Sequence, residues 1–581
     1  MMISGNRRAR LVSIVALGAA LMFPAQAQAQ AGKLPKILSD PATAAANPLP
    51  DFSYAGYGFG LAPIPADAGT VVEVTDHGAI PDDGLDDSKA VLRALAAANA
   101  VKGKVTLRFP KGRTQITEIL RITRSDIILD GAGDGPGGSE LWFPRPLKLI
   151  DKSHDYDELR EYLVREKKQQ VEPEHNIDYL FTEYTWSGGM IYVAPEGSRP
   201  VSYDGTKDVR DPVLATGVSG KQFARTLTVD DPSKLKVGDV VQLQWFSVDG
   251  PKSKILKSLY GDTDLPIGSH HWTFPNRPVV AQATRVAAIR GKTVMLGDPL
   301  LHDIRADQPA VVADWKHLTN IGIQNLRLQF PEAPAFGHHL EQGYNGIYMT
   351  GVFDGWIRKL TIDRADSGIL TDNAASLTIS DIITTGDRRA HYSVHVGAVH
   401  NVLVKDLKVE NPVVHPLSIN TRSTRSVFLR AVVGRDAIID QHSGSNHQNL
   451  FDQVEMHIDP KQGKEGWQYQ LWVGGGAPYW KPGHGLYNTL WNAKLVMPES
   501  VPADAMVTIT SGLEGPGERI VGLHANRKIT VHYTPAPYIE GTGQAVDAAP
   551  SLYDYQLARR AADRGLLLER RDGGGVDERR A

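Results

Sequence analysis

The chain has 581 residues, and its 63 basic and 66 acidic side chains leave a formal net charge of −3. A hydrophobic content of 41% and a charged content of 22% exclude a mostly disordered chain. The near-neutral charge argues against a general nucleic-acid binder, which needs a basic face. The absence of cysteine excludes disulfides, thiolate zinc sites and cysteine nucleophiles.

The first residues have the features of an export signal. An arginine-rich start precedes an apolar stretch over 11–23, which is shorter than the about 20 residues that a membrane span needs. Pro24 and alternating alanines follow, as at a signal-peptide cleavage site. We therefore expect a signal peptide over 1–31, no membrane span, and a periplasmic or secreted protein. A retained membrane anchor is the alternative.

A strand, an acidic loop, a helix and a second strand follow a linker over 32–70. The helix is expected over 89–100, with Asp87 or Ser88 as its N-cap, and the second strand over 104–109. This order resembles the N-terminal cap of the pectate-lyase superfamily, the right-handed β-helix proteins that include pectate lyases, polygalacturonase-like hydrolases and phage tailspikes. The resemblance implies a cap on a β-helix and a carbohydrate substrate. It implies no catalytic residues, because the motifs of the polygalacturonases are not matched.

The acidic loop over 82–88 raises the question of a calcium ion. It lacks the full Asp-x-Asp-x-Asp-Gly-x5-Glu pattern of a calcium loop, and the carboxylates that hold calcium in typical pectate lyases are not evident. We expect no cofactor, with calcium as the alternative.

Two segments interrupt the N-terminal part of the predicted β-helix, which covers 71–214. A polar excursion over 147–185 contains an expected helix over 155–168. An inserted small β module is expected over 215–310, with a histidine–tryptophan cluster at 270–272. That cluster either stacks on sugar rings or packs on its own domain.

The main β-helix is predicted over 311–540 because apolar positions recur there every 22 to 25 residues. One such series is Leu360, Ile382, Leu407, Val432 and Val454, and another, three residues earlier, is Ile357, Ile379, Val404, Leu429 and Phe451. Short strands at this period predict stacked coils of an all-β, right-handed, single-stranded parallel β-helix with an N-terminal cap helix. A leucine-rich horseshoe lacks its motif here. Residues 541–581 are expected to form a frayed tail.

The coil register predicts one polar stripe on the outside of the β-helix. If Ile347, Ile369, Val394 and Ile419 point inward, their neighbours point outward. His395, Asn420 and His442 would then form one ladder within about 10 Å, given the usual strand spacing of about 4.8 Å. The predicted catalytic residues are His395, His442, Arg422, Asn420 and Asp440.

Further polar residues are expected to bind substrate around this stripe: Tyr348, Asp372, Arg364, Asp387, Arg389, His391, His415, His447 and Trp480. The alternative is a solvated face on which these side chains satisfy turn backbone groups. We expect no metal, because the spacing of His391 and His395 suits a helix and not a strand.

Histidine suits proton transfer near neutral pH, and arginine and asparagine suit neutralisation of a carboxylate. The stripe therefore favours a polysaccharide lyase that cleaves a uronate-containing polysaccharide by β-elimination. A glycoside hydrolase that uses Asp366, Asp387 or Asp440 is one alternative, and a non-catalytic carbohydrate-binding β-helix is the other. The expected partner is a polysaccharide or oligosaccharide and no nucleic acid. The oligomeric state is left open.

Overall fold

The computed structural model of the chain describes residues 32–168, 181–198, 210–265, 267, 277–442, 444–475, 482–513, 515–535, 537–564, 568–571 and 575–578. The predicted signal peptide, the cluster at 270–272 and Trp480 lie outside the described residues. No described helix is long and apolar enough to cross a bilayer.

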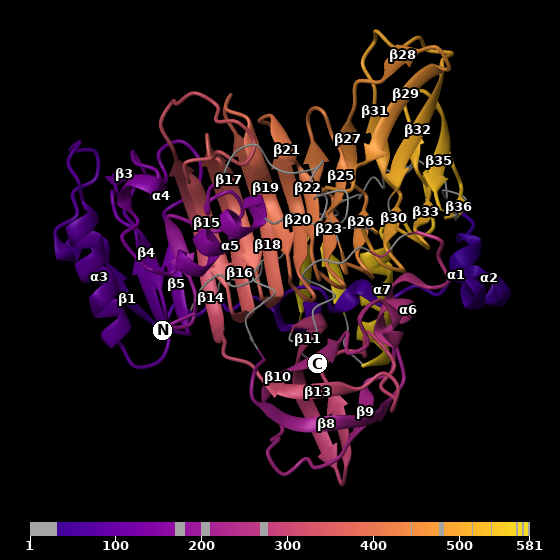
Figure 1. The fold of residues 1–581 in the computed structure, drawn as a ribbon. Coiled ribbons are helices and arrows are strands. Elements are labelled where there is room, and N and C mark those ends of the chain that lie inside the picture. Colours follow the sequence, from indigo (N-terminus) through magenta and orange to yellow (C-terminus); the bar gives the residue numbers. More distant parts are fainter. Residues whose placement is uncertain are drawn as a thin grey trace, which may run out of the picture.

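The chain folds into a right-handed parallel β-helix, as predicted, with coils stacked along one axis (Figure 1). Two long parallel sheets form its walls. The first, sheet A, has 18 strands. They are β1 (Thr70–Glu73), β2 (Val105–Arg108), β3 (Gly112–Gln115), β5 (Ile127–Asp130), β6 (Ser139–Trp142), β14 (Leu318–Gln329), β16 (Val352–Asp363), β18 (Ala375–Thr385), β20 (Leu403–Val409), β23 (Val427–Leu429), β24 (Val432–Val433), β26 (Leu450–Asp452), β27 (Glu455–His457), β30 (Thr489–Trp491), β31 (Lys494–Val496), β33 (Arg519–Val521), β34 (His524–Ala525) and β36 (Tyr538–Glu540).

Sheet B has 12 strands and carries most of the predicted stripe. In chain order they are β4 (Leu120–Ile122), β7 (Ile191–Val193), β15 (Asn345–Thr350), β17 (Ser367–Asp372), β19 (Ala390–Gly397), β21 (Val413–His415), β22 (Leu417–Asn420), β25 (Ile439–His442), β28 (Lys461–Gly463), β29 (Gly466–Trp472), β32 (Met506–Leu513) and β35 (Lys528–Thr534). Apolar residues from the two sheets, such as Ile369, Val394 and Ile379, are buried between them. Stacking is what buries them, since one coil alone has no partner for its apolar face.

Left-handed backbone corners recur at fixed places in sheet A. One column of residues with φ between 53° and 58° is Asn325, Lys359, Asp381, Asp406 and Arg430. A second, with φ between 47° and 59°, is Asp354, Ser376, Asn401, Arg425 and Gln448. A positive φ is uncommon outside glycine. Its repetition in successive coils shows that the turn is set by the stacked architecture and not by the local residue type.

The coil spacing differs from the sequence prediction at two places. On sheet B, Val394 aligns with Ile369 as expected, but Ile419 aligns with Val396, and His395 aligns with Ser418. Asn420 and His442 pair, as expected. His395 pairs with Ser418 and not with Asn420, so the expected ladder is wrong by two residues at His395. The shift is an even number of residues, so His395 keeps its face of the sheet.

On sheet A, the observed register differs from the predicted one by one residue, so different side chains fill the core. Phe428 takes the core position expected for Leu429, and it pairs with Val404 and Phe451. Val432 is half-buried, whereas Ala431 is fully buried. The expected positions of Leu429 and Val432 are therefore wrong. A one-residue slip turns each side chain to the other face of the sheet.

The inserted module is a closed antiparallel barrel that lies against one side of the β-helix (Figure 1). Its strands are β8 (Val213–Gly220), β9 (Thr226–Val229), β10 (Val240–Phe246), β11 (Pro278–Arg290), β12 (Thr293–Leu296) and β13 (Ala310–Asp314), with the helix α6 (Lys254–Tyr260). The barrel has its own apolar core, which contains Trp245 and Leu259.

Helices cover the N-terminal coils. The cap helix α3 (Ser88–Ala100) lies at that end of the stack (Figure 1) and buries Val91 and Leu95. In the polar excursion, α4 (Leu147–Ile150) precedes α5 (Asp157–Lys168), and Leu159 and Leu163 of α5 reach the main core.

The terminal segments pack on the outside of sheet A. The segment expected to be a linker contains α1 (Lys36–Ser39), α2 (Pro41–Ala46) and two short 3₁₀ turns over 52–54 and 57–60. The segment expected to be a frayed tail contains α7 (Leu552–Asp563). Tyr553 of α7 donates a hydrogen bond to the carbonyl of Ala55 at 2.8 Å, and Phe52 is fully buried. Both segments are therefore part of the folded structure.

Candidate functional site

Sheet B brings a group of histidines together beside one aspartate. His391 and His395 come from β19, His415 from β21, and Asp440 and His442 from β25. These strands are consecutive rungs of the sheet, which explains how residues up to 51 positions apart in the sequence meet. A loop over 331–344 adds His338, His339 and Glu341. We call this group the sheet B histidine cluster.

Asp440 is the centre of one half of the cluster. Its carboxylate is fully buried and lies 3.2 Å from Nδ1 of His415 and 3.2 Å from Nδ1 of His442. The hydroxyl of Ser418 donates to Asp440 at 2.6 Å, and the backbone N–H of Gly475 donates at 3.2 Å. Burial alone would raise the pKa of Asp440, but the two histidines and their hydrogen bonds hold it well below its usual value. Asp440 is therefore an ionised anchor for two rings.

Glu341 occupies the equivalent place in the other half. Its Oε1 lies 3.1 Å from Nδ1 of His391, and Nε2 of His391 lies 3.1 Å from Nε2 of His338. Burial raises the pKa of Glu341 to about 7. The ring centroids of His391 and His415 are 5.3 Å apart, so the two halves are in contact.

Several buried ring nitrogens of the cluster have no aligned hydrogen bond to any described residue. They are Nδ1 of His391, Nε2 of His395, and both nitrogens of His415. Nδ1 of His395 lies 3.2 Å from the carbonyl of Thr371 and must donate to it, which leaves Nε2 as an acceptor. A buried polar atom without a partner is costly, so these nitrogens are candidate positions for a ligand or a water molecule.

Burial also keeps these rings neutral. It lowers the pKa of His395 to about 3 and the pKa of His338 to about 4, and it lowers the pKa of His391 well below its ordinary value, with neighbouring histidines adding to the shift. Neutral imidazole offers a lone pair, which is needed for proton abstraction and for metal binding.

Two glycines make room for the histidine rings. A Cβ on Gly397 would lie 2.0 Å from the His395 ring, and a Cβ on Gly475 would lie 1.9 Å from Nδ1 of His442. Neither position has the left-handed backbone that favours glycine, so space is the reason for the residue type.

The least enclosed members of the cluster define its outer side. His338 and Arg389 are exposed, and the side chain of His442 is 14% exposed. By contrast His395 is only 4% exposed, which is less than its predicted role as an outward-facing catalytic group requires. Among the cluster histidines that come from strands, His442 is the most exposed and remains in reach of a substrate.

The structure places several predicted site residues elsewhere. Arg422 is half-buried and donates to the carbonyl of Pro278 in the barrel at 3.4 Å. Arg364 and Asp387 form a surface ion pair at 3.3 Å. Tyr348 is buried on an earlier rung, where its hydroxyl donates to Asp372 at 3.4 Å. Asn420 does lie beside the cluster and donates to Ser418.

His447 belongs to a second polar group, where the barrel meets the β-helix. Its Nε2 lies 2.8 Å from Nε2 of His302, which follows β12 of the barrel. His447 is 1% exposed, so it is an interface residue and not one that faces a substrate beside His442.

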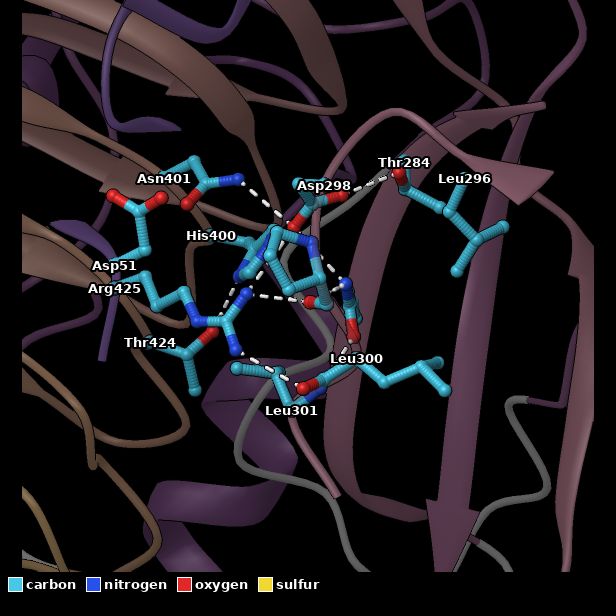
Figure 2. Close-up of polar contacts among 12 residues, drawn as sticks. Asp51, Thr284, Leu296, Asp298, Leu300, Leu301, His400, Asn401, Thr424 and Arg425 are labelled. Carbon is cyan, nitrogen blue, oxygen red and sulfur yellow. Dashed lines mark hydrogen bonds and ion pairs between the residues drawn. The ribbon is translucent and has the colours of Figure 1, made fainter. Parts of the chain in front are cut away.

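The centre of this interface is Asp298, which follows β12 (Figure 2). Its carboxylate lies 2.7 Å from Nε2 of His400 and 3.8 Å from the guanidinium of Arg425. His400 also contacts the hydroxyl of Thr424 at 2.7 Å, and Arg425 donates to the carbonyls of Pro299 and Leu300 and to Gln448. Every polar side-chain atom of Asp298, His400 and Arg425 thus has a partner, as expected for a structural contact.

A polar hollow of about 670 Å³ lies at the N-terminal end of sheet A. Arg113 and Arg327 line it, and both pair with Glu140, at 2.5 and 3.9 Å. Its acidic wall includes Asp82, whose carboxylate accepts from the backbone N–H of Arg113 at 2.8 Å. Because these charges are already paired, the sheet B histidine cluster is the stronger candidate site.

The loop that completes the cluster was not among the site residues predicted from the sequence. His338, His339 and Glu341 stand in the segment Gly337-His338-His339-Leu340-Glu341, and this adjacent histidine pair followed by a carboxylate was the available signal. The loop lies between β14 and β15, outside the repeating strands, so the repeat of the coils does not predict that it contacts β19.

Comparisons with known proteins give similarity at the level of solved structures only. No protein-family model matches the chain, and no curated protein matches it. The chain is similar to the tailspike protein gp49 from Pseudomonas phage LKA1, with 12% identity, 81% of each chain covered and a TM-score of 0.43. It is also similar to the A-module of mannuronan C-5 epimerase AlgE4 from Azotobacter vinelandii, with 11% identity, 81% and 96% coverage and a TM-score of 0.33.

A third similar structure is DFA-IIIase from Arthrobacter chlorophenolicus A6 without its lid, with 12% identity, 81% and 93% coverage and a TM-score of 0.36. At such identities and scores, no activity is transferred from these proteins to this chain.

Proposed function

We propose that this protein is a carbohydrate-active enzyme that cleaves a uronate-containing polysaccharide by β-elimination at the sheet B histidine cluster. The observation that carries the proposal is the Asp440–His442 pair. Asp440 lies at Nδ1 of His442, so the neutral ring carries its proton there and presents the lone pair of Nε2. Among the cluster histidines that come from strands, His442 is the most exposed and can reach a substrate.

The reaction needs three events at the sugar. Nε2 of His442 takes the proton at C5, the electron pair forms the C4=C5 double bond, and the C4–O bond to the leaving sugar breaks. The imidazolium returns a proton to the leaving oxygen. Asp440 stabilises the imidazolium, as a buried carboxylate does in other histidine–aspartate pairs. The step needs no oxidant or reductant.

Arg389 is our candidate for binding the substrate carboxylate. It is exposed, and within the described part of the chain it forms no ion pair or side-chain hydrogen bond. Its charge contributes to the lowered pKa of His338, which places it near the cluster. Arginine suits this role because its guanidinium binds a carboxylate with two parallel hydrogen bonds. Arg422, the cation expected from the sequence, is instead held toward the barrel.

Ultraviolet absorbance tests the proposal, because elimination creates a conjugated unsaturated product. The full chain is incubated with alginate, polygalacturonate, hyaluronan and heparan sulfate. We expect absorbance to rise with at least one of them, and His442→Ala to lower the rate by about 10²- to 10⁴-fold, the usual contribution of a general base. The matched control is His457→Ala, at a half-exposed histidine of sheet A that pairs with Glu455.

A glycoside hydrolase is the second candidate, because Glu341 and Asp440 are two buried carboxyls on either side of the contact between His391 and His415. Hydrolysis uses two carboxyls. New reducing ends without ultraviolet absorbance would favour it and reject elimination. Neither signal with any of these substrates would reject the elimination proposal for them.

A further inference from the structure

Three histidines meet at the junction of β19, β21 and the loop over 331–344, and we propose that His338, His391 and His415 bind a divalent transition-metal ion of the zinc class. One ring nitrogen from each lies within 4.8 Å of one from each of the others. Imidazole nitrogens are preferred ligands of zinc, copper, iron and nickel. The inference does not rest on the elimination reaction.

The spacing of the nitrogens suits one ion. Zn–N bonds of about 2.0 to 2.1 Å at tetrahedral angles place two ligand nitrogens about 3.3 Å apart. Nε2 of His338 and Nε2 of His391 are 3.1 Å apart. Without an ion, one of these nitrogens must carry a proton for the other to accept. Binding of the ion replaces that contact and releases the proton.

Each of the two buried ligands, His391 and His415, has a carboxylate oxygen next to its Nδ1. Oε1 of Glu341 lies 3.1 Å from Nδ1 of His391, and Oδ2 of Asp440 lies 3.2 Å from Nδ1 of His415. Metal-binding histidines in proteins usually present their other nitrogen to a carboxylate, which fixes the tautomer and directs the lone pair of the far nitrogen at the ion. Glu341 and Asp440 are therefore positioning residues for Nε2 of His391 and of His415.

The unfilled nitrogens support a missing group at this place. Nε2 of His415 is buried and has no hydrogen-bond partner in the described residues, and His415 as a whole is 6% exposed. The polar group around Asp298 shows that this chain supplies partners to buried histidines when no ligand is involved.

Three protein ligands leave one position of a tetrahedral ion for water or a substrate oxygen, which is the arrangement of catalytic zinc sites. His338 is the exposed ligand, so the ion would lie at the outer edge of the cluster. Such an ion would bind an oxygen of a substrate held beside His442.

Metal titration of the full chain tests the inference. The protein is purified without a histidine tag, treated with a chelator, and titrated with Zn²⁺ in a calorimeter and with Co²⁺ in a spectrophotometer. We expect one ion per chain, the visible absorption of tetrahedral Co²⁺, and a higher melting temperature with Zn²⁺, because an ion that binds the folded state stabilises it.

Variants identify the ligands. His338→Gln changes an exposed residue and is expected to leave the fold intact, as circular dichroism would show, while it abolishes the Co²⁺ spectrum. His415→Gln is expected to do the same. Glu341→Gln is expected to lower Zn²⁺ affinity by about 10- to 100-fold, the usual effect of losing an orienting carboxylate. His457→Gln is the control and should leave binding unchanged.

Two results would overturn the inference. One is the absence of a bound ion at micromolar Zn²⁺ or Co²⁺. The other is binding that survives His338→Gln but is lost in His442→Gln, because His415, Asp440 and His442 form a second group whose ligand atoms lie within 4.8 Å of one another. The first result leaves elimination untouched, since elimination is read from ultraviolet absorbance, whereas the second would place the ion on His442, the proposed base.

Discussion

The chain buries histidines beside an aspartate in two regions, one around Asp440 on sheet B and one around Asp298 where the barrel meets the β-helix. Both aspartates are fully buried, and each has a histidine nitrogen within 3.2 Å. Around Asp298, an arginine, a threonine, a glutamine and backbone carbonyls complete the contacts (Figure 2). Around Asp440, Nε2 of His395 and Nε2 of His415 have no hydrogen-bond partner among the described residues.

This difference separates a structural contact from a candidate site. His400 and His415 are both buried beside an aspartate, so such burial does not by itself identify function. What differs is that ring nitrogens of the cluster lack a hydrogen-bond partner among the described residues, whereas both nitrogens of His400 have one, and a buried polar atom without a partner costs free energy.

The largest expected effect comes from the same substitution made in both regions. Asp298→Asn leaves the guanidinium of Arg425 buried without a counter-charge, and we expect it to lower the free energy of unfolding by about 3 to 5 kcal/mol. Asp440→Asn weakens the contacts with Ser418, His415 and His442 but leaves no arginine unpaired, and we expect a loss of about 1 to 3 kcal/mol. Urea denaturation measures both.

Activity should respond in the opposite order. Asp440→Asn is expected to remove most turnover, whereas Asp298→Asn should retain it at a temperature where the variant is folded. Equal stability losses, or loss of turnover only in the Asp298 variant, would erase the distinction between the regions.

A second test moves a ring without changing any charge. Gly475→Ala places a Cβ 1.9 Å from Nδ1 of His442 and 2.8 Å from Asp440, so the ring must shift. A displacement of about 1 Å can lower an enzymatic rate by about 10²-fold, and we expect a loss of that order in the ultraviolet assay. Gly463→Ala, where the nearest atom is 3.9 Å from the new Cβ, is the control. Unchanged turnover in Gly475→Ala would remove His442 from the mechanism.

A third test uses pH at the interface. Burial lowers the pKa of His400 below 6.5, against the opposing effect of Asp298. The unfolded state therefore binds more protons below pH 6.5, and the contribution of His400 to stability is lost as the pH falls. We expect His400→Gln to flatten the decrease in the free energy of unfolding between pH 7 and pH 5, relative to the unmodified protein. His457→Gln should leave the slope unchanged, and an equal slope in His400→Gln would contradict the assignment.

The smallest effect is expected at the surface ion pair of Arg364 and Asp387. The carboxylate is 84% exposed, so Asp387→Ala should change the free energy of unfolding by less than about 1 kcal/mol. Because Asp387 pairs with Arg364 and with no histidine of the cluster in the described part of the chain, turnover should stay near its original value. A large loss of turnover would restore Asp387 to the substrate-binding role that the sequence suggested.

The resemblance to known β-helix proteins and the repeat of 22 to 25 residues predicted the architecture, because each rung needs an apolar pair at the same place. The repeat did not give the register. Ile419 aligns with Val396 and not with Val394, because the number of residues in each turn varies. The alternation of apolar and polar residues does not distinguish registers that differ by two residues. His395 was still a predicted site residue on the correct face, because an even shift keeps a side chain on its face, and His391 and His415 were expected around the stripe.

By itself, the sequence determined that the chain is an all-β repeat protein with an insertion, and that histidines gather on one wall. Tertiary structure alone decided which of them share a site. His338 and Glu341 come from a loop outside the repeat. His447 lies in the interface with the barrel, where it contacts His302, 145 residues earlier in the chain. Such contacts depend on where loops and domains dock, which is set by long-range packing and is not encoded in the local alternation of residues.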